Sequence, residues 1–87
     1  MNKQVVSTPK APAAVGPYSQ AIRTGNLMFL SGQVPIDPAT GKLVEGDAAT
    51  QAVQCCKNVL AILDSQGMTA ANLVKVTVFI TDITTFG

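Results

Sequence analysis

The stretch from Asp47 to Gly67 carries the one long helical pattern in these 87 residues, so the rest of the chain must build its core from strands and loops. Aspartate is a favoured N-cap residue, and glycine commonly ends a helix. Between the two, apolar side chains recur at spacings of three and four, which predicts one buried face. The residues of that face are Ala49, Ala52, Val53, Cys56, Val59, Leu60 and Leu63, and Ala48, Cys55 and Ile62 widen it.

Short apolar runs on the N-terminal side of this helix predict strands. One strand is expected around Val5 and Val6. The runs 19–23 and 27–31 predict a hairpin, because glycine and asparagine between them suit a tight turn. A further short strand is expected at 42–44. These strands would form a largely antiparallel sheet.

After the helix, residues 72–81 alternate in the pattern of a strand. One face is predicted to pack on the helix, and the other to face a neighbouring subunit because it includes Leu73 and Phe79. The first face comprises Val74, Val76, Val78 and Ile80. Residues 82–86 resemble the start of another helix. A single helix packed on a largely antiparallel sheet is an α+β arrangement.

The balance of apolar and charged residues limits the class of protein. Hydrophobic residues make up 47% and charged residues 13%, whereas an average domain has about 25% charged residues. This composition excludes intrinsic disorder, which requires low hydrophobicity and high charge. Residues 1–87 are expected to form a single small domain that buries some apolar surface between subunits.

Several kinds of chemistry are excluded by residues that the chain lacks. It contains no histidine, so a Ser-His-Asp triad, a Cys-His dyad and a histidine-ligated metal are ruled out within it. Its net charge is +1 and it has no tryptophan, which argues against strong nucleic-acid binding. No run is long enough to span a membrane, and no secretory signal is recognisable, so the cytoplasm is the expected location.

The adjacent cysteines, Cys55 and Cys56, are predicted to be structural and not bonded to each other, because neighbouring side chains on a helix point apart. The helical pattern places Cys56 on the apolar face and Cys55 beside it. Cys56 is therefore predicted to react more slowly with thiol reagents.

Two short stretches could carry chemistry. Tyr18 is the only tyrosine, and it follows the rigid Gly16-Pro17 pair, so its phenol could hold a ligand or orient a water. Ser31 and Gly32 stand at a strand end, where a hydroxyl and accessible backbone N–H groups could hold a carboxylate. A structural tyrosine and a bulge that redirects the strand are the alternatives.

Spaced motifs along the whole chain resemble the Rid family, the YjgF-like reactive intermediate deaminases. The matching stretches are APAAVGPYSQA at 11–21, SGQ at 31–33, DPATG at 37–41 and VKVTVFITD at 74–82, together with Asn58-Val59, Ile62-Leu63 and Gly67 of the predicted helix. The resemblance implies a chorismate-mutase-like α+β fold, with a sheet packed by helices. It also implies a homotrimer with ligand clefts between subunits.

The activity that the resemblance implies is hydrolysis of reactive 2-imino acids and their enamine tautomers to 2-oxo acids and ammonia, with no cofactor and no metal. The partners would be a small 2-imino or 2-oxo acid and two further copies of the chain. Some family members are described instead as ligand-binding regulators or as ribonucleases that inhibit translation, and these remain the alternatives.

The family's site residues match this sequence only in part. Tyr18 matches the site tyrosine, and Gly32, with Ser31 before it, matches the glycine whose backbone faces the ligand. The family's carboxylate-binding arginine lies in a later Pro-Ala-Arg segment and a helpful glutamate lies near the family C-terminus, and neither occurs among these 87 residues. The chain therefore resembles a family member without the C-terminal third, and these 87 residues alone are expected to be poorly soluble and essentially inactive on imino acids.

Overall fold

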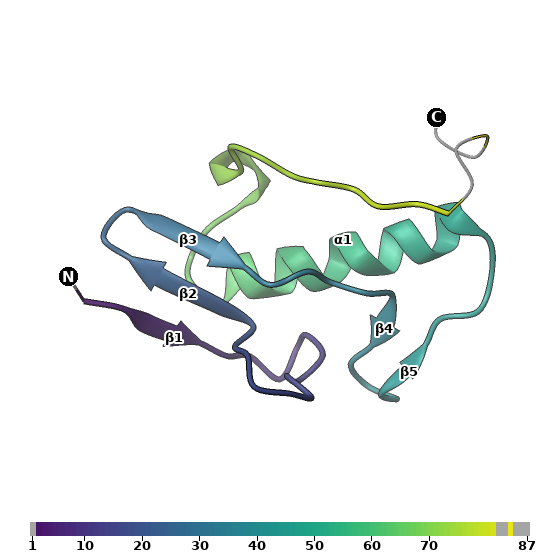
Figure 1. Ribbon diagram of the computed structural model, residues 1–87, viewed down its shortest axis with the longest axis horizontal. Helices are drawn as coiled ribbons and strands as arrows, with labels where there is room; N and C mark the ends of the chain where they lie inside the picture. Colours follow the sequence, from purple (N-terminus) through teal and green to yellow (C-terminus); the bar gives the residue numbers. More distant parts are fainter. Residues whose placement is uncertain (1, 82–83, 85–87) are drawn as a thin grey trace.

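The computed structural model describes residues 2–81 and Thr84, and arranges them as two small antiparallel sheets beside one long helix (Figure 1). The first sheet has the order β1-β2-β3, and the second pairs β4 with β5. The elements are β1 (Gln4–Val6), β2 (Ala21–Thr24), β3 (Leu27–Leu30), β4 (Ile36–Asp37), β5 (Lys42–Leu43), α1 (Ala48–Asp64) and the 3-10 turn η1 (Ala70–Asn72). The N-terminal strands agree with the sequence prediction, whereas the single continuous sheet that it expected is divided in two.

The β2–β3 hairpin forms where the sequence predicted it. Thr24 pairs with Leu27, so the turn between them has two residues. Gly25 takes a φ of 55° in this turn, a backbone conformation that glycine adopts without strain. The antiparallel pairing of β1 with β2 then completes the three-stranded sheet.

The boundaries of α1 also agree with the prediction. The Asp47 carboxylate accepts a hydrogen bond from Thr50 N at 2.9 Å, and this contact lowers the pKa of the Asp47 carboxyl. At the other end, Gly67 has a φ of 68°, and Met68 N donates to Leu63 O at 2.9 Å. These are the features of a helix closed by a glycine in the left-handed conformation.

The buried face of α1 agrees with the predicted one only in part. Ile62 and Leu63 are buried as predicted, and Asn58 is buried beside them, whereas Val53 and Leu60 of the predicted face are exposed. The helix is anchored through Asn58, whose Nδ2 donates to the carbonyls of Val34 at 3.2 Å and Ile36 at 2.9 Å. A hydrophobic pattern counts asparagine as a surface residue, so it did not identify Asn58 as part of the buried face.

The core lies between the three-stranded sheet and the C-terminal half of α1. It is small and has a contribution from the loop after β1. The buried apolar residues that form it are Val6, Ala11, Ala21 and Ile62, with Met28, Leu30 and Ala61 packed against them. Within the described part of the chain, no helix is long and apolar enough to cross a membrane.

The predicted strand at 72–81 is wrong in its pairing. Residues 73–80 follow η1 as an extended segment that pairs with no strand among the described residues, as the yellow segment of Figure 1 shows. Neither predicted face is buried: Val74 is 94% exposed and Phe79 is 92% exposed.

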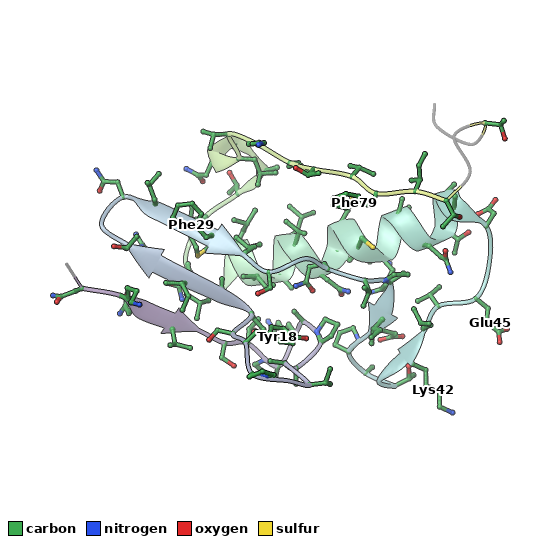
Figure 2. The ribbon with its side chains drawn as sticks, in the orientation of Figure 1. Tyr18, Phe29, Lys42, Glu45 and Phe79 are labelled. Atoms are coloured by element: carbon green, nitrogen blue, oxygen red, sulfur yellow. The ribbon has the colours of Figure 1, made fainter. Side chains whose placement is uncertain are left out.

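The ring of Phe29 on β3 is exposed as well, and Figure 2 labels both Phe29 and Phe79. An extended segment becomes a strand only when another strand supplies hydrogen bonds. The predicted helix start at 82–86 lies largely outside the described residues.

The cysteines are free, as predicted, but their order of burial is reversed. Cys55 is half-buried and Cys56 is exposed. Burial raises the pKa of the Cys55 thiol, and the neighbouring Cys56 adds to this effect. Because the thiolate is the reacting species, Cys56 should be alkylated faster than Cys55 in the native protein. Peptide mass spectrometry after brief iodoacetamide treatment measures this. Equal native rates, or faster labelling of Cys55, would contradict the observed helix face.

Candidate functional site

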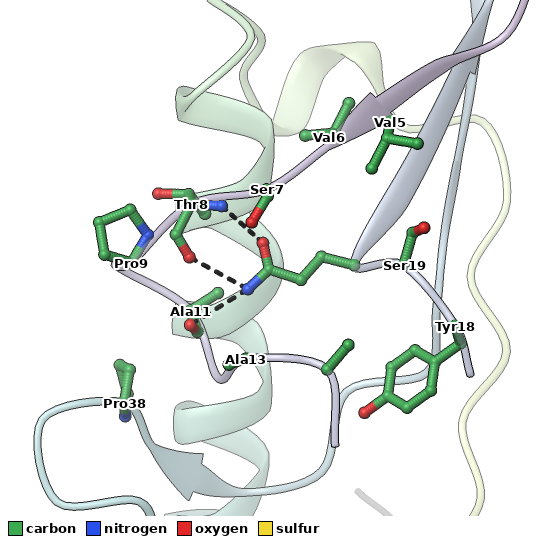
Figure 3. A pocket seen from close by; sticks show the side chains of 12 residues that line it. Val5, Val6, Ser7, Thr8, Pro9, Ala11, Ala13, Tyr18, Ser19 and Pro38 are labelled. Atoms are coloured by element: carbon green, nitrogen blue, oxygen red, sulfur yellow. Dashed lines mark hydrogen bonds between the residues drawn. The ribbon is translucent and has the colours of Figure 1, made fainter. Parts of the chain in front are cut away.

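An open pocket of about 570 Å³ lies where the loop after β1 returns to the start of β2 (Figure 3). Its volume is in the range of pockets that hold small molecules. In the described part of the chain, no charged side chain lines it. The lining residues are Val5, Val6, Ser7, Thr8, Pro9, Ala11, Ala13, Ala14, Tyr18, Ser19, Gln20 and Pro38.

The loop that forms the pocket wall is held by the side chain of Gln20. Gln20 Oε1 accepts a hydrogen bond from Thr8 N at 2.6 Å. The two hydrogens on its Nε2 are shared among the carbonyls of Thr8 at 3.0 Å, Ala11 at 3.2 Å and Pro12 at 2.8 Å. The dashed lines in Figure 3 mark the bonds that meet Thr8 and Ala11. The buried amide of Gln20 thus supplies hydrogen bonds to backbone groups of a loop whose prolines have no N–H to donate.

Tyr18 stands across the pocket from Pro9 in the view of Figure 3. Its backbone N donates to Gly16 O at 2.8 Å, which makes a tight turn before the ring. Its side chain is 50% exposed, and its hydroxyl oxygen accepts a hydrogen bond from Val15 N at 3.5 Å. Among the described residues, the hydroxyl has no acceptor for its own hydrogen. That hydrogen is therefore available to a ligand.

Ser31 and Gly32 do not line this pocket. The Ser31 hydroxyl donates to Ser19 O, and Ser31 N donates to Gln20 O at 2.9 Å, so this residue ties the end of β3 to the segment next to Tyr18. Gly32 is exposed, and a Cβ built on it would meet nothing within 4 Å. Within residues 2–81 and Thr84, no other group therefore lies close to Gly32 on the side where a Cβ would point. The ligand-binding roles of both residues stay predictions.

The pocket has a neutral electrostatic character. Arg23 lies on β2 and is not one of the lining residues. Its guanidinium donates to Gln66 Oε1 at 3.4 Å. Within the described residues, no three acidic, cysteine or histidine side chains lie together as metal ligands. The arrangement can hold a small neutral or weakly polar group against aliphatic walls and donate one hydrogen bond from Tyr18.

Gln20 is the functional-site residue that sequence reasoning missed. Because Gln20 lies in the run 19–23, which was predicted as a hairpin strand, it was interpreted as an ordinary strand residue. The signal that could have identified it is its place directly after a loop with three prolines, since the carbonyls of such a loop need donors from elsewhere.

Comparison with known proteins connects this geometry to a family. Residues 8–87 match the family model described as Endoribonuclease L-PSP. A RutC family protein of Haemophilus influenzae is 51% identical over 99% of this chain and 65% of its own length. The 2-iminobutanoate/2-iminopropanoate deaminase of Mus musculus is 46% identical over 98% of this chain and 64% of its own length. The chain thus spans about two thirds of the length of these relatives.

Solved structures agree on the fold. The Escherichia coli TdcF structure with bound serine matches with a TM-score of 0.90 and 40% identity, over 95% of this chain and 65% of that one. The YjgF gene product of Escherichia coli matches with a TM-score of 0.72 and 42% identity, over 77% of this chain and 52% of that one. The chain therefore has the YjgF-like α+β fold.

Proposed function

This chain belongs to the Rid/YjgF family, also described as Endoribonuclease L-PSP, and from that membership we propose that its protein hydrolyses reactive 2-imino acids to 2-oxo acids and ammonia. The observation that carries the proposal is the 46% identity to a relative named as a 2-iminobutanoate/2-iminopropanoate deaminase. The site of this reaction is the pocket that contains Tyr18.

The reaction makes few demands on the protein. Water adds to the carbon of a protonated imine, so a C–O bond forms. The C–N bond then breaks, and the nitrogen leaves as ammonia while the carbonyl of the 2-oxo acid forms. Tyr18, whose hydroxyl already accepts from Val15 N, uses its hydrogen to hold the attacking water, or donates it to the nitrogen of the neutral imine in the earlier step that protonates the imine. No strong base is required, so a chain without histidine can perform this step.

The pocket suits a short aliphatic substrate. Its walls carry valine, alanine and proline side chains, which can surround the methyl or ethyl group of a short 2-imino acid. The TdcF relative was solved with serine, a ligand of the same size that also has a carboxylate next to a nitrogen-bearing carbon. This supports a small 2-substituted carboxylic acid as the ligand class.

A binding role without turnover is the second candidate. It is favoured by the neutral pocket wall, since a substrate carboxylate finds no cationic side chain among the described lining residues. RNA cleavage, the activity in the family description, is less well supported, because a net charge of +1 and the absence of histidine suit neither a phosphate backbone nor acid–base cleavage.

We further propose that three chains assemble with the Tyr18 pocket near a subunit boundary. The support is the apolar surface of this small chain, which includes exposed Phe29 and Leu27 on β3. Light scattering at micromolar concentration should return the mass of three chains, and the mass of one chain would contradict the assembly.

The function is tested with an extended chain, meaning residues 1–87 continued by the C-terminal segment of a family member that carries Pro-Ala-Arg. A threonine dehydratase generates 2-iminobutanoate, and semicarbazide traps the imine that escapes hydrolysis. The extended chain should lower the amount trapped. Unchanged trapping together with saturable binding of 2-oxobutanoate would indicate the binding role, and RNA digestion that weakens at higher salt would indicate a ribonuclease.

A further inference from the structure

We propose that Gln20 is the positioning residue of the Tyr18 site, because its carboxamide holds the loop that supports the Tyr18 hydroxyl. The inference rests on the proposed function for its catalytic consequence. Gln20 is 4% exposed and is one of only a few buried polar residues in the described chain. Its side chain lies in the pocket wall, two residues after Tyr18.

The carboxamide of Gln20 behaves like a peptide group inserted into the loop. Thr8 both donates to its oxygen and accepts from its nitrogen, as two paired strand residues do. The same nitrogen also reaches the carbonyls of Ala11 and Pro12. Pro9 and Pro12 cannot donate backbone hydrogen bonds, so the loop has few other means of closing on itself. Gln20 therefore determines where residues 8–12 lie.

The position of residues 8–12 affects Tyr18 through Val15, which lies a short distance along the chain. Val15 is three residues beyond Pro12, and Val15 N is the donor to the Tyr18 hydroxyl oxygen. The other end of the segment is held at Ser19, whose carbonyl accepts from the Ser31 hydroxyl. The ring is half-exposed, and these two anchors hold the segment on either side of it. Loss of the Gln20 anchor frees the Val15 side of the segment.

The chain offers a sensitive reporter for this inference. Tyr18 is the only tyrosine and there is no tryptophan, so excitation at wavelengths longer than those that phenylalanine absorbs reports on this one ring in the 87-residue chain. The test compares Gln20→Met, which keeps the length of the side chain and removes all four hydrogen bonds, with Gln51→Met. Gln51 Nε2 donates to Val44 O at 3.2 Å, remote from the pocket, so it is a matched control.

Acrylamide quenching of Tyr18 emission should increase in Gln20→Met and stay at the wild-type value in Gln51→Met. In the extended chain, Gln20→Met should lower kcat about tenfold or more with KM little changed, since a small misplacement of a reacting group is costly. Gln20→Glu keeps the acceptor and loses the donors, and it should behave as Gln20→Met does.

Each outcome decides between the two proposals. Unchanged quenching in a folded Gln20→Met chain overturns the positioning role, even when deaminase activity is present. Increased quenching without any wild-type deaminase activity supports the positioning of Tyr18 and counts against the proposed reaction. Unfolding of both Gln20 variants, measured by circular dichroism, also overturns the inference, because the carboxamide would then hold the whole fold and not the loop.

Discussion

Replacing Asn58 with aspartate should remove a large part of the free energy of unfolding of the chain at neutral pH. Asn58 is 1% exposed, and its Nδ2 is the donor to both Val34 O and Ile36 O. A carboxylate has nearly the same shape but no hydrogen to donate, so it would face two carbonyl oxygens in a buried site. Leaving two buried partners unsatisfied costs about 2–6 kcal/mol, and burial of the charge adds to this. Domains of this size are stable by roughly 4–13 kcal/mol.

The measurement is urea unfolding followed by circular dichroism at pH 7 and pH 3. The pKa of the introduced carboxyl should be raised in the folded state, so the destabilisation is full above that pKa and is relieved as the pH falls through it. Asn72→Asp is the matched control, because the exposed Asn72 side chain accepts from Thr69 N at 2.9 Å and a carboxylate accepts equally well. A stable Asn58→Asp chain would contradict the anchoring of α1 described above.

The second large effect concerns the substrate carboxylate. The 87-residue chain should hydrolyse 2-iminobutanoate at least about a hundredfold more slowly than the extended chain that carries Pro-Ala-Arg. Hydrogen bonds to charged groups contribute about 1.5–3 kcal/mol each, and a bidentate arginine makes two. Each 1.4 kcal/mol corresponds to about tenfold in rate or affinity. Equal rates in the semicarbazide assay would show that the arginine is dispensable.

A conservative change within the extended chain provides the control for that comparison. Replacement of the segment's arginine by lysine keeps the positive charge but loses the two-pronged geometry, so most of the rate gain should be lost. If lysine restores the full rate, general charge attraction explains the effect, and the bidentate contact does not.

The sequence was sufficient for features that depend on local geometry. The tight turn at Gly25 and the ends of α1 at Asp47 and Gly67 depend on backbone preferences of single residues, and all three agree with the structure. The family and its α+β fold were also predictable, because several motifs occur in the family's order along the whole chain.

Features that depend on distant partners could not be predicted. The apolar pattern of α1 contains two overlapping stripes, and the choice between them was made by buried Asn58, whose partners are more than twenty residues away. The alternation at residues 73–80 indicates a strand, but strand formation needs a pairing neighbour, and alternation does not supply one. Gln20 was missed for the same reason, because its structural role depends on hydrogen bonds to residues 8–12, which form a separate segment.

The most direct test of the account is the turnover of 2-iminobutanoate by the extended chain with and without the Tyr18 hydroxyl. Tyr18 is a half-exposed residue whose hydroxyl is bonded only to Val15 N among the described residues, so Tyr18→Phe should change the unfolding midpoint little. Turnover in the semicarbazide assay should fall about a hundredfold, the usual size of a lost acid–base or water-orienting group. A Tyr18→Phe protein that retains the wild-type rate would contradict the assignment of Tyr18 as the catalytic residue.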